Sequence, residues 1–259
     1  MFVEATAYED TMGRWSRILA ADFCRFVDFP DQGQILDVGC GTGALIEELS
    51  KRTCRANLMG IDPSSSFIEY ARKRLDGDRH RFIVGDACHM PFDTASVNGC
   101  ASSLVLMLIS DPRRLASEMC RVTCKRGVVA ACTWDVTGME MIEIVWDEAM
   151  RLDDGAQAFV RRPVQCNRKG ELSELWTNLG LADVTEVPMR IQTPFASFED
   201  FWLPFEKGAG TRTGAYIQQL QEDHKSALRG ALFSRLCGSS SRAFCLSALA
   251  WAVKGTVPA

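Results

Sequence analysis

Three glycines in one short stretch are the most informative feature of this sequence. Gly39, Gly41 and Gly43 follow the apolar segment ILDV and precede the helical segment ALIEELSKR. Glycines at such a place permit a tight turn and let a ligand approach the backbone where a helix begins. Because Gly39, Gly41 and Ala44 also satisfy the dinucleotide-binding pattern G-x-G-x-x-A, the loop alone does not choose between nucleoside-containing cofactors.

Three aspartates help to distinguish between two nucleoside-containing cofactors. Asp37 lies two residues before the first glycine, where a carboxylate repels a pyrophosphate but suits a cation. Asp62 ends the next apolar segment, where an acid accepts hydrogen bonds from ribose hydroxyls. Asp86 follows the third such segment, where a carboxylate can take an adenine amino group. Asp62 and Asp86 could instead cap helices or turns. Together, however, the three acids favour S-adenosylmethionine (SAM), which carries a sulfonium and an ammonium, over a nicotinamide dinucleotide.

The elements that must position these residues are visible in the alternation of apolar and amphipathic segments. A helix is predicted first, with Trp15, Ile18, Leu19, Phe23, Phe26 and Val27 near one face. Strands then alternate with helices, which predicts a parallel sheet built from right-handed βαβ units. The predicted strands are 34–39, 57–62, 80–86, 97–108 and 127–134.

The pattern changes after Trp134. Helices are predicted over 139–152 and 169–180, an antiparallel strand over 182–193, and mostly helix over 195–237. A last strand is predicted within 241–255. Trp134 is expected at the carboxyl edge of the sheet. The later aromatics at 195, 198, 201, 202 and 205 are interpreted as core, with an apolar acceptor pocket as the alternative.

Composition narrows the class of protein. The chain has 259 residues and a formal charge of −4, which disfavours a nucleic-acid-binding protein. The opening MFVEATAYED lacks the basic and apolar regions of a secretory signal, and no apolar run reaches the roughly 18–20 residues of a membrane span. We therefore expect a cytoplasmic protein whose eleven cysteines stay reduced, without a metal site.

The segments ILDVGCGTG, GID, VGDACHMPF and SSLVLMLISDP, in this order, resemble the class I SAM-dependent methyltransferases. More narrowly, they are similar to the type 11, ubiquinone/menaquinone C-methyltransferase-like group. The lead YEDTMGRWSRILA and the later PFASFEDFWLPFEKGAGTRTGAYIQQL extend this resemblance over nearly the whole chain.

The resemblance implies a fold and a division of the chain. It implies an α/β, Rossmann-like, mostly parallel seven-stranded sheet in the order 3-2-1-4-5-7-6, flanked by helices. Within a single methyltransferase domain, it implies an N-terminal helical lid (1–30), a SAM-binding core (31–192 and 243–259) and a helical cover inserted before the last strand (193–242).

The resemblance also implies roles for individual residues. The methionine part of SAM would lie against the glycine loop, the ribose against the end of the second strand, the adenine against the loop after the third, and the lid over the whole. The implied cofactor-binding residues are Tyr8, Arg14, Trp15, Asp37, Gly39, Cys40, Gly41, Gly43, Asp62, Pro63, Asp86, Ala87, Cys88, Ser102 and Ser103. No catalytic base is assigned; His80 and His224 are expected at the surface, and His89 is the histidine nearest the expected adenine end.

The chain departs from the family pattern at three places. Asn98 stands where relatives often carry Asp, Met107 where many carry His, and Lys125–Gly127 in place of a Pro-Gly-Gly turn. The expected activity is methyl transfer to a small, apolar or aromatic acceptor, in a monomer or homodimer. The first two departures keep a non-catalytic SAM-fold binding or regulatory protein as an alternative, and the glycine loop keeps an NAD-dependent oxidoreductase as a second.

Overall fold

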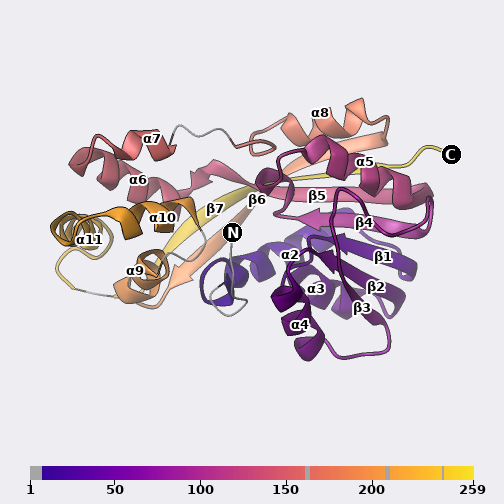
Figure 1. Cartoon of the computed structure of the whole chain (residues 1–259), viewed down its shortest axis with the longest axis horizontal. Helices are drawn as coiled ribbons and strands as arrows, with labels where there is room; N and C mark the ends of the chain where they lie inside the picture. The colour runs from indigo at the N-terminus through magenta and orange to yellow at the C-terminus, as the bar shows by residue number, and fades with distance from the viewer. Residues whose placement is uncertain (1–7, 161–163, 208–210, 241) are drawn as a thin grey trace. The chain divides into compact units, whose positions relative to one another are not determined.

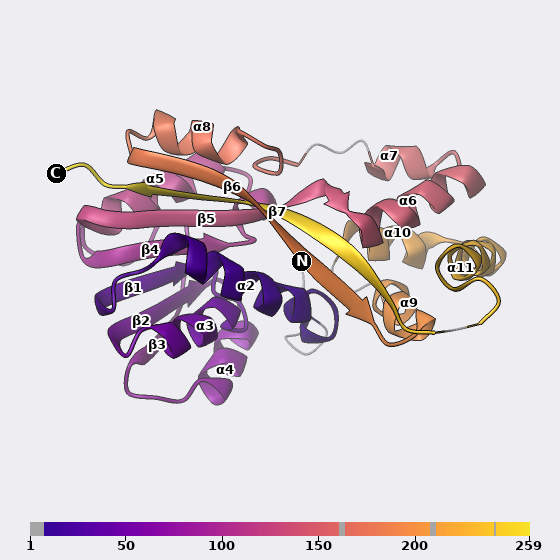
Figure 2. The same ribbon diagram turned by 180° about the vertical axis from the view of Figure 1, so that it is seen from behind.

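The computed structural model describes residues 8–160, 164–207, 211–240 and 242–259. These residues form two compact units. One comprises residues 13–135, 164–189 and 250–259, and the other residues 1–12, 136–163 and 190–249. Figure 1 labels their elements, and Figure 2 shows them from behind. We call them the sheet unit and the helical unit; three long strands have a part in each.

The sheet unit is built on a seven-stranded sheet with the order β3-β2-β1-β4-β5-β7-β6, as predicted. The pairs β1–β2, β1–β4, β2–β3 and β4–β5 are parallel. The strands are β1 (Gln32–Val38), β2 (Arg55–Asp62), β3 (His80–Val84), β4 (Val97–Ser103), β5 (Thr123–Met139), β6 (Ala182–Phe195) and β7 (Phe244–Thr256).

The strand β7 runs antiparallel to both of its neighbours in the sheet, β5 and β6. Arg126 and Gly127 of β5 exchange backbone hydrogen bonds with Val257, just past the end of β7, whereas Gly138 lies against Leu249. The start of β5 therefore faces the end of β7, so this pair is antiparallel. In the same way Gln192 contacts Cys245, while Gly255 lies against Ala182, so β6 is antiparallel to β7.

Helices of the sheet unit pack through apolar side chains. The helix α2 packs on α3, and α5 packs on α8 (Figure 2). Leu115 and Met119 of α5 and Trp176 of α8 are fully buried in one cluster with strand residues. The helices and turns of this unit are α2 (Arg14–Val27), α3 (Ala44–Arg52), α4 (Ser65–Arg74), η2 (Leu106–Leu108, a 3-10 turn), α5 (Pro112–Val122) and α8 (Glu171–Asn178). The π-helix η1 (Glu9–Gly13) precedes α2, and all of it but Gly13 belongs to the helical unit.

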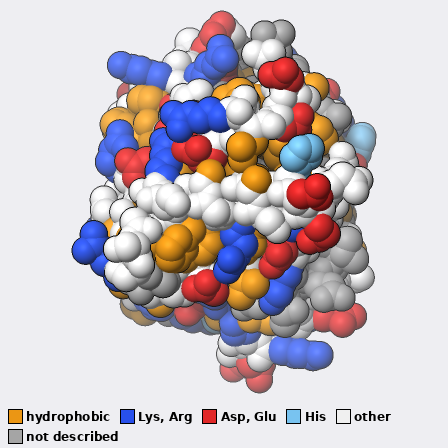
Figure 3. All heavy atoms as spheres, turned by 90° about the vertical axis from the view of Figure 1, so that its left-hand side faces the viewer, with side chains coloured by type: hydrophobic (Ala, Val, Ile, Leu, Met, Phe, Trp, Pro, Cys, Tyr) orange, Lys and Arg blue, Asp and Glu red, His pale blue; other side chains and the backbone are white. Residues whose placement is uncertain are grey.

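The helical unit has an aromatic core. Phe195, Phe198, Phe201, Trp202 and Phe205 are at most 6% exposed, and their rings pack on one another. The structure thus supports the core interpretation of these residues rather than a pocket lining. The helices here are α6 (Glu140–Leu152), α7 (Ala156–Val160), α9 (Phe198–Glu206), α10 (Arg212–Gln219) and α11 (Glu222–Cys237). The face in Figure 3 mixes acidic, basic and apolar side chains.

Two predictions about elements are wrong, and one short helix was not predicted. The predicted strand 97–108 ends at Ser103, because Leu104 has a left-handed backbone (φ +65°) and η2 follows it. Trp134 does not end the fifth strand, which continues to Met139. The short helix α7 was not predicted; its five residues are too few to show a periodicity.

The compact units divide the chain differently from the predicted lid, core and cover. Residues 136–163, predicted to belong to the core, group with 190–249. Among the described residues, no helix is both long and apolar enough to cross a membrane. Six of the eleven cysteines are buried among core side chains: Cys24, Cys40, Cys100, Cys132, Cys166 and Cys237.

Candidate functional site

The three predicted aspartates lie at one edge of the sheet. Asp37 is the last residue but one of β1, and Asp62 is the last residue of β2. Asp86 lies two residues after the end of β3. Asp37 pairs with Gly60, and Asp62 pairs with Val84, so the carboxyl ends of the three parallel strands align. The strand order reverses between β1 and β4, which is where open α/β sheets bind ligands.

Asp37 is a buried carboxylate. The residue is 1% exposed, and neither Oδ1 nor Oδ2 has a hydrogen-bond partner among the described residues. Burial, with a smaller contribution from the charge of Asp62, raises the pKa of Asp37 to about 8. A buried charge is costly unless it is paired, so this carboxylate is suited to a cationic ligand.

The glycine loop leaves space for a side-chain atom at one position. A Cβ atom on Gly41 would have only Phe67 within 4 Å, at 3.9 Å. A Cβ on Gly39 would instead lie 2.4 Å from Val105, and one on Gly43 2.7 Å from Leu75. All three glycines have positive φ, so each is required by the backbone. Gly39 and Gly43 are also required by packing, whereas Gly41 faces open space.

Asp62 braces the glycine loop. Its Oδ2 accepts a hydrogen bond from the Gly41 backbone N–H at 2.9 Å, and its Oδ1 accepts one from Ser64 at 2.9 Å. Burial raises the pKa of Asp62, although these two hydrogen bonds oppose the shift. A carboxylate has about four acceptor sites, so each oxygen can still accept a ribose hydroxyl. Pro63, the next predicted residue, is exposed.

Asp86 shapes the loop that follows β3. Its Oδ1 accepts a hydrogen bond from the Cys88 backbone N–H at 2.8 Å, and its Oδ2 lies 2.9 Å from Nδ1 of His89. The hydrogen bond with His89 lowers the pKa of Asp86. Its side chain is 62% exposed, and Ala87 beside it is buried. Asp86 thus caps this turn, as its alternative reading allowed, and keeps acceptor sites open to solvent.

The side chains of Cys40, Ser102 and Ser103 contact protein groups. The Cys40 thiol packs over Gly60, whose added Cβ would lie 2.7 Å from its Sγ. Burial raises the pKa of this thiol well above its usual range, so it is not a reactive thiolate. Ser102 donates to the Val38 carbonyl at 2.9 Å, and Ser103 lies 3.3 Å from Sγ of Cys132. These side chains hold the edge of the sheet together.

The predicted lid residues belong to different units. Tyr8 is half-buried and falls in the helical unit, whereas Arg14 and Trp15 open α2 in the sheet unit. The Arg14 guanidinium lies 4.2 Å from the centre of the Trp15 ring, and Trp15 is buried. The first seven residues of the predicted lid lie outside the described residues. Closure over a ligand stays a prediction.

The departures from the family pattern lie at three different places in the fold. Asn98 accepts a hydrogen bond from the Gln34 N–H at 2.9 Å, at the amino end of β4 and opposite the edge that carries Asp37. It therefore bears on strand pairing and not on the candidate site. Met107 lies in η2, half-buried. Arg126 takes a left-handed backbone (φ +64°) in the turn that replaces Pro-Gly-Gly.

The histidines differ in their surroundings. His80 is half-buried rather than on the surface as predicted, with its ring nitrogens 3.2 Å from the Leu75 carbonyl oxygen and 3.1 Å from Oγ of Ser50. His224 is exposed, as predicted. His89 is exposed and paired with Asp86. None is assigned as a catalytic base.

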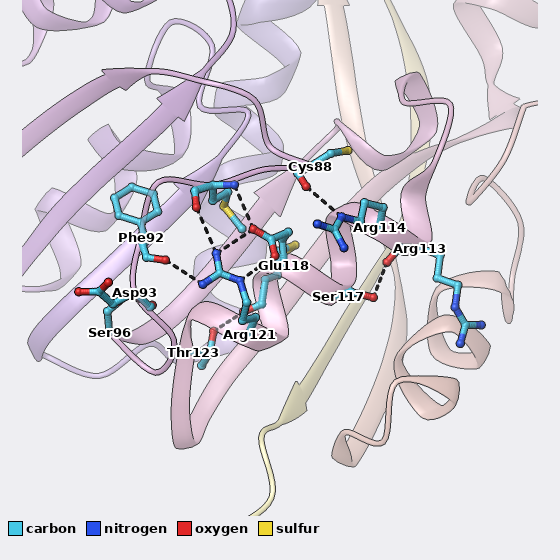
Figure 4. Close-up of polar contacts among 12 residues, drawn as sticks. Cys88, Phe92, Asp93, Ser96, Arg113, Arg114, Ser117, Glu118, Arg121 and Thr123 are labelled. Atoms are coloured by element: carbon cyan, nitrogen blue, oxygen red, sulfur yellow. Dashed lines mark hydrogen bonds and ion pairs between the residues drawn. The ribbon is translucent and has the colours of Figure 1, made fainter.

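Sequence reasoning missed the contribution of α5. Arg114, Glu118 and Arg121 of this helix bind backbone atoms of the loop that carries Asp86 (Figure 4). The signal was an acid and an arginine three residues apart on one helix face, a spacing at which side chains meet.

Comparisons with known proteins agree with this site. Residues 36–131 match the family model described as "Methyltransferase domain", a segment that contains Asp37, the glycine loop, Asp62 and Asp86. Demethylmenaquinone methyltransferase of Thermotoga maritima is 36% identical over 95 residues, covering 36% of this chain and 40% of that protein. Malonyl-[acyl-carrier protein] O-methyltransferase of Serratia marcescens is 30% identical over 115 residues, 44% of each chain. The matches thus span less than half of these relatives.

The fold extends the similarity to most of the chain. The structure of phosphoethanolamine N-methyltransferase 2 of Haemonchus contortus, a complex with phosphomonomethylethanolamine and S-adenosylhomocysteine, matches with a TM-score of 0.59 at 16% identity. The match covers 98% of this chain and 57% of that one. The predicted resemblance to methyltransferases and the predicted sheet order are confirmed.

Proposed function

We propose that this chain, whose residues 36–131 match a methyltransferase domain, binds SAM and transfers its methyl group to a small molecule. The observation that carries the proposal is the Asp37 carboxylate, which is 1% exposed and has no hydrogen-bond partner on either oxygen within the described parts of the chain. An ammonium group is the partner that such a carboxylate lacks. The residues present therefore fit the cofactor.

The chain's own residues would divide the work of binding. Asp37 would take the ammonium, and the backbone of Gly41 would let the methionine part approach. Asp62 would accept ribose hydroxyls while it keeps the loop fixed through its bond to the Gly41 N–H. Asp86, Ala87 and Cys88 would frame the adenine. The bound cofactor supplies an electrophilic methyl group, and the protein supplies alignment and exclusion of water.

The acceptor is the less constrained part of the proposal. An aromatic or apolar small molecule is favoured by the demethylmenaquinone methyltransferases among the relatives, although others are named for malonyl-acyl carrier protein. The buried aromatics of the helical unit do not add to this argument, since they fill one another's space. A quinone and phenol library is the first set to test.

Two measurements separate this function from its alternatives. Calorimetry with S-adenosylhomocysteine and with NADH distinguishes a SAM site from a dinucleotide site, because Asp37 would repel a pyrophosphate. Transfer of a tritiated methyl group to the library then distinguishes an enzyme from a non-catalytic binding protein. Tight binding of NADH with no binding of S-adenosylhomocysteine would overturn the proposal.

A further inference from the structure

The loop between β3 and β4 is fastened to α5 through main-chain atoms. Glu118 of α5 is 6% exposed, and its Oε2 accepts a hydrogen bond from the Met90 N–H at 3.0 Å. Arg121 donates to the carbonyl oxygens of Met90 at 3.1 Å and Phe92 at 2.8 Å. Arg114 donates from Nε to the Cys88 carbonyl at 3.1 Å. Figure 4 shows all three side chains turned toward the loop.

Two of these side chains, Glu118 and Arg121, also form an ion pair with each other. Arg121 donates to both carboxylate oxygens of Glu118, from Nε at 2.7 Å and from Nη2 at 2.8 Å. The hydrogen bond from Arg121, followed by that from Met90, holds the pKa of Glu118 below its usual value. A buried carboxylate needs such pairing, and the two-pronged guanidinium fixes its orientation. The pair is therefore a rigid anchor for the loop.

Cys88 is held from two sides. Its N–H donates to Asp86, and its carbonyl oxygen accepts from Arg114. The helix itself is fixed at this end, because Asp111 caps it by accepting the Arg114 N–H at 2.9 Å and Pro112 follows. The position of the loop is thus set by a helix that contributes none of the predicted cofactor-binding residues.

We propose that Arg114, Glu118 and Arg121 are positioning residues that set the adenine end of the candidate site. Arg114 fixes the peptide after Asp86 and Ala87, and the pair Glu118–Arg121 fixes the segment that follows. This inference rests on the proposed function, since it assigns the loop to adenine. It requires that removing a contact between α5 and the loop lowers the affinity for every adenosine-bearing ligand by the same factor, whatever is attached to the 5′ carbon of the ligand.

Arg114 and Arg113 form a matched pair for the test. Both are exposed arginines in the first turn of α5, but the side chain of Arg113 points away from the loop in Figure 4. Arg114→Ala is expected to weaken S-adenosylhomocysteine about 3- to 10-fold, the value of one charge-assisted hydrogen bond partly replaced by water. Arg113→Ala removes the same charge and is expected to change the affinity by less than about twofold.

Two ligands show whether the affinity is lost at the adenosine part of the site. Both S-adenosylhomocysteine and 5′-methylthioadenosine contain the adenosine group, but the second lacks the amino acid. Arg114→Ala is expected to weaken both by equal factors in calorimetry. It is also expected to speed hydrogen exchange at residues 88–92 of the unliganded protein, which Arg113→Ala leaves unchanged.

A second pair controls for lost stability. Glu118→Gln keeps the shape and an acceptor for the Met90 N–H but removes the charge that Arg121 binds. Glu148 of the helical unit is a comparable carboxylate, buried and bound by Arg151 and Arg235, so Glu148→Gln lowers the melting temperature by the same mechanism. Only Glu118→Gln is expected to weaken both ligands.

The outcomes keep the two proposals apart. If the wild-type protein binds neither ligand, the proposed function fails. If it binds both, but Arg114→Ala behaves like Arg113→Ala, or weakens only S-adenosylhomocysteine, the positioning role is wrong while the function stands. If Glu118→Gln does not fold, the arginine pair still decides, because both of its positions are exposed.

Discussion

Replacing Asp37 by Asn tests the centre of the proposed site. In the structure the carboxyl group has a pKa of about 8, because of its burial and the nearby charge of Asp62, against 3.8 for an unperturbed aspartate. Binding an ammonium requires the ionised form. A group with this pKa is about 1% ionised at pH 6 and about 9% at pH 7, so the affinity for S-adenosylhomocysteine should rise about ninefold between these values.

The same shift affects stability with a definite sign. The folded-state pKa lies above the unfolded one, so the stability that the protonated group provides is complete below about pH 4 and is lost as the pH rises through about 8. The loss at pH 7 is about 4 kcal/mol, at roughly 1.4 kcal/mol per unit. An asparagine avoids this loss but leaves a buried amide unsatisfied, at about 1–3 kcal/mol. The unliganded Asp37→Asn protein should therefore be more stable at pH 7, by roughly 1–3 kcal/mol.

Calorimetry at pH 6, 7 and 8, with urea unfolding at the same values, checks both effects. Asp37→Asn should weaken S-adenosylhomocysteine about 30- to 150-fold at pH 8, for about 2–3 kcal/mol of lost charge-assisted bonding, and should abolish the ninefold rise. The control ligand is 5′-methylthioadenosine, which lacks the ammonium and should show no rise in either protein. Equal pH slopes for S-adenosylhomocysteine in wild type and Asp37→Asn would refute the assignment of Asp37.

Three further changes test other parts of the site. Gly41→Ala should lower the affinity for SAM at least tenfold while costing only about 1–2 kcal/mol of stability. Gly39→Ala should lower the stability more, because its Cβ meets Val105. If folded Gly41→Ala binds SAM as tightly as the wild type, the loop is only a structural turn. Asp62→Ala should weaken SAM by roughly 2–4 kcal/mol and also lower stability, because the Gly41 N–H loses its acceptor; a loss below about tenfold in calorimetry would remove Asp62 from the site. Bound S-adenosylhomocysteine should slow hydrogen exchange at residues 8–16, and identical exchange with and without it would mean that this segment only packs.

The sequence by itself determined that the first five strands form a parallel sheet and which residues lie at its binding edge. Strands that are buried on both faces appear as continuous apolar runs, and parallel strands bring their carboxyl ends to one edge. For this reason Asp37, the glycine loop, Asp62 and Asp86 could be identified from position alone. The order of the strands in the sheet came from the family resemblance, because alternation predicts a strand but not its neighbour.

Only the tertiary structure decided what each of these side chains contacts. Burial and hydrogen bonding depend on atoms distant in the sequence, so neither the isolation of the Asp37 carboxylate nor the brace from Asp62 to Gly41 could be predicted. The same holds for α5, whose Glu118 meets a loop 28 residues earlier. The local sequence shows which side chains can form hydrogen bonds, and the fold determines which of these side chains remain available to a ligand.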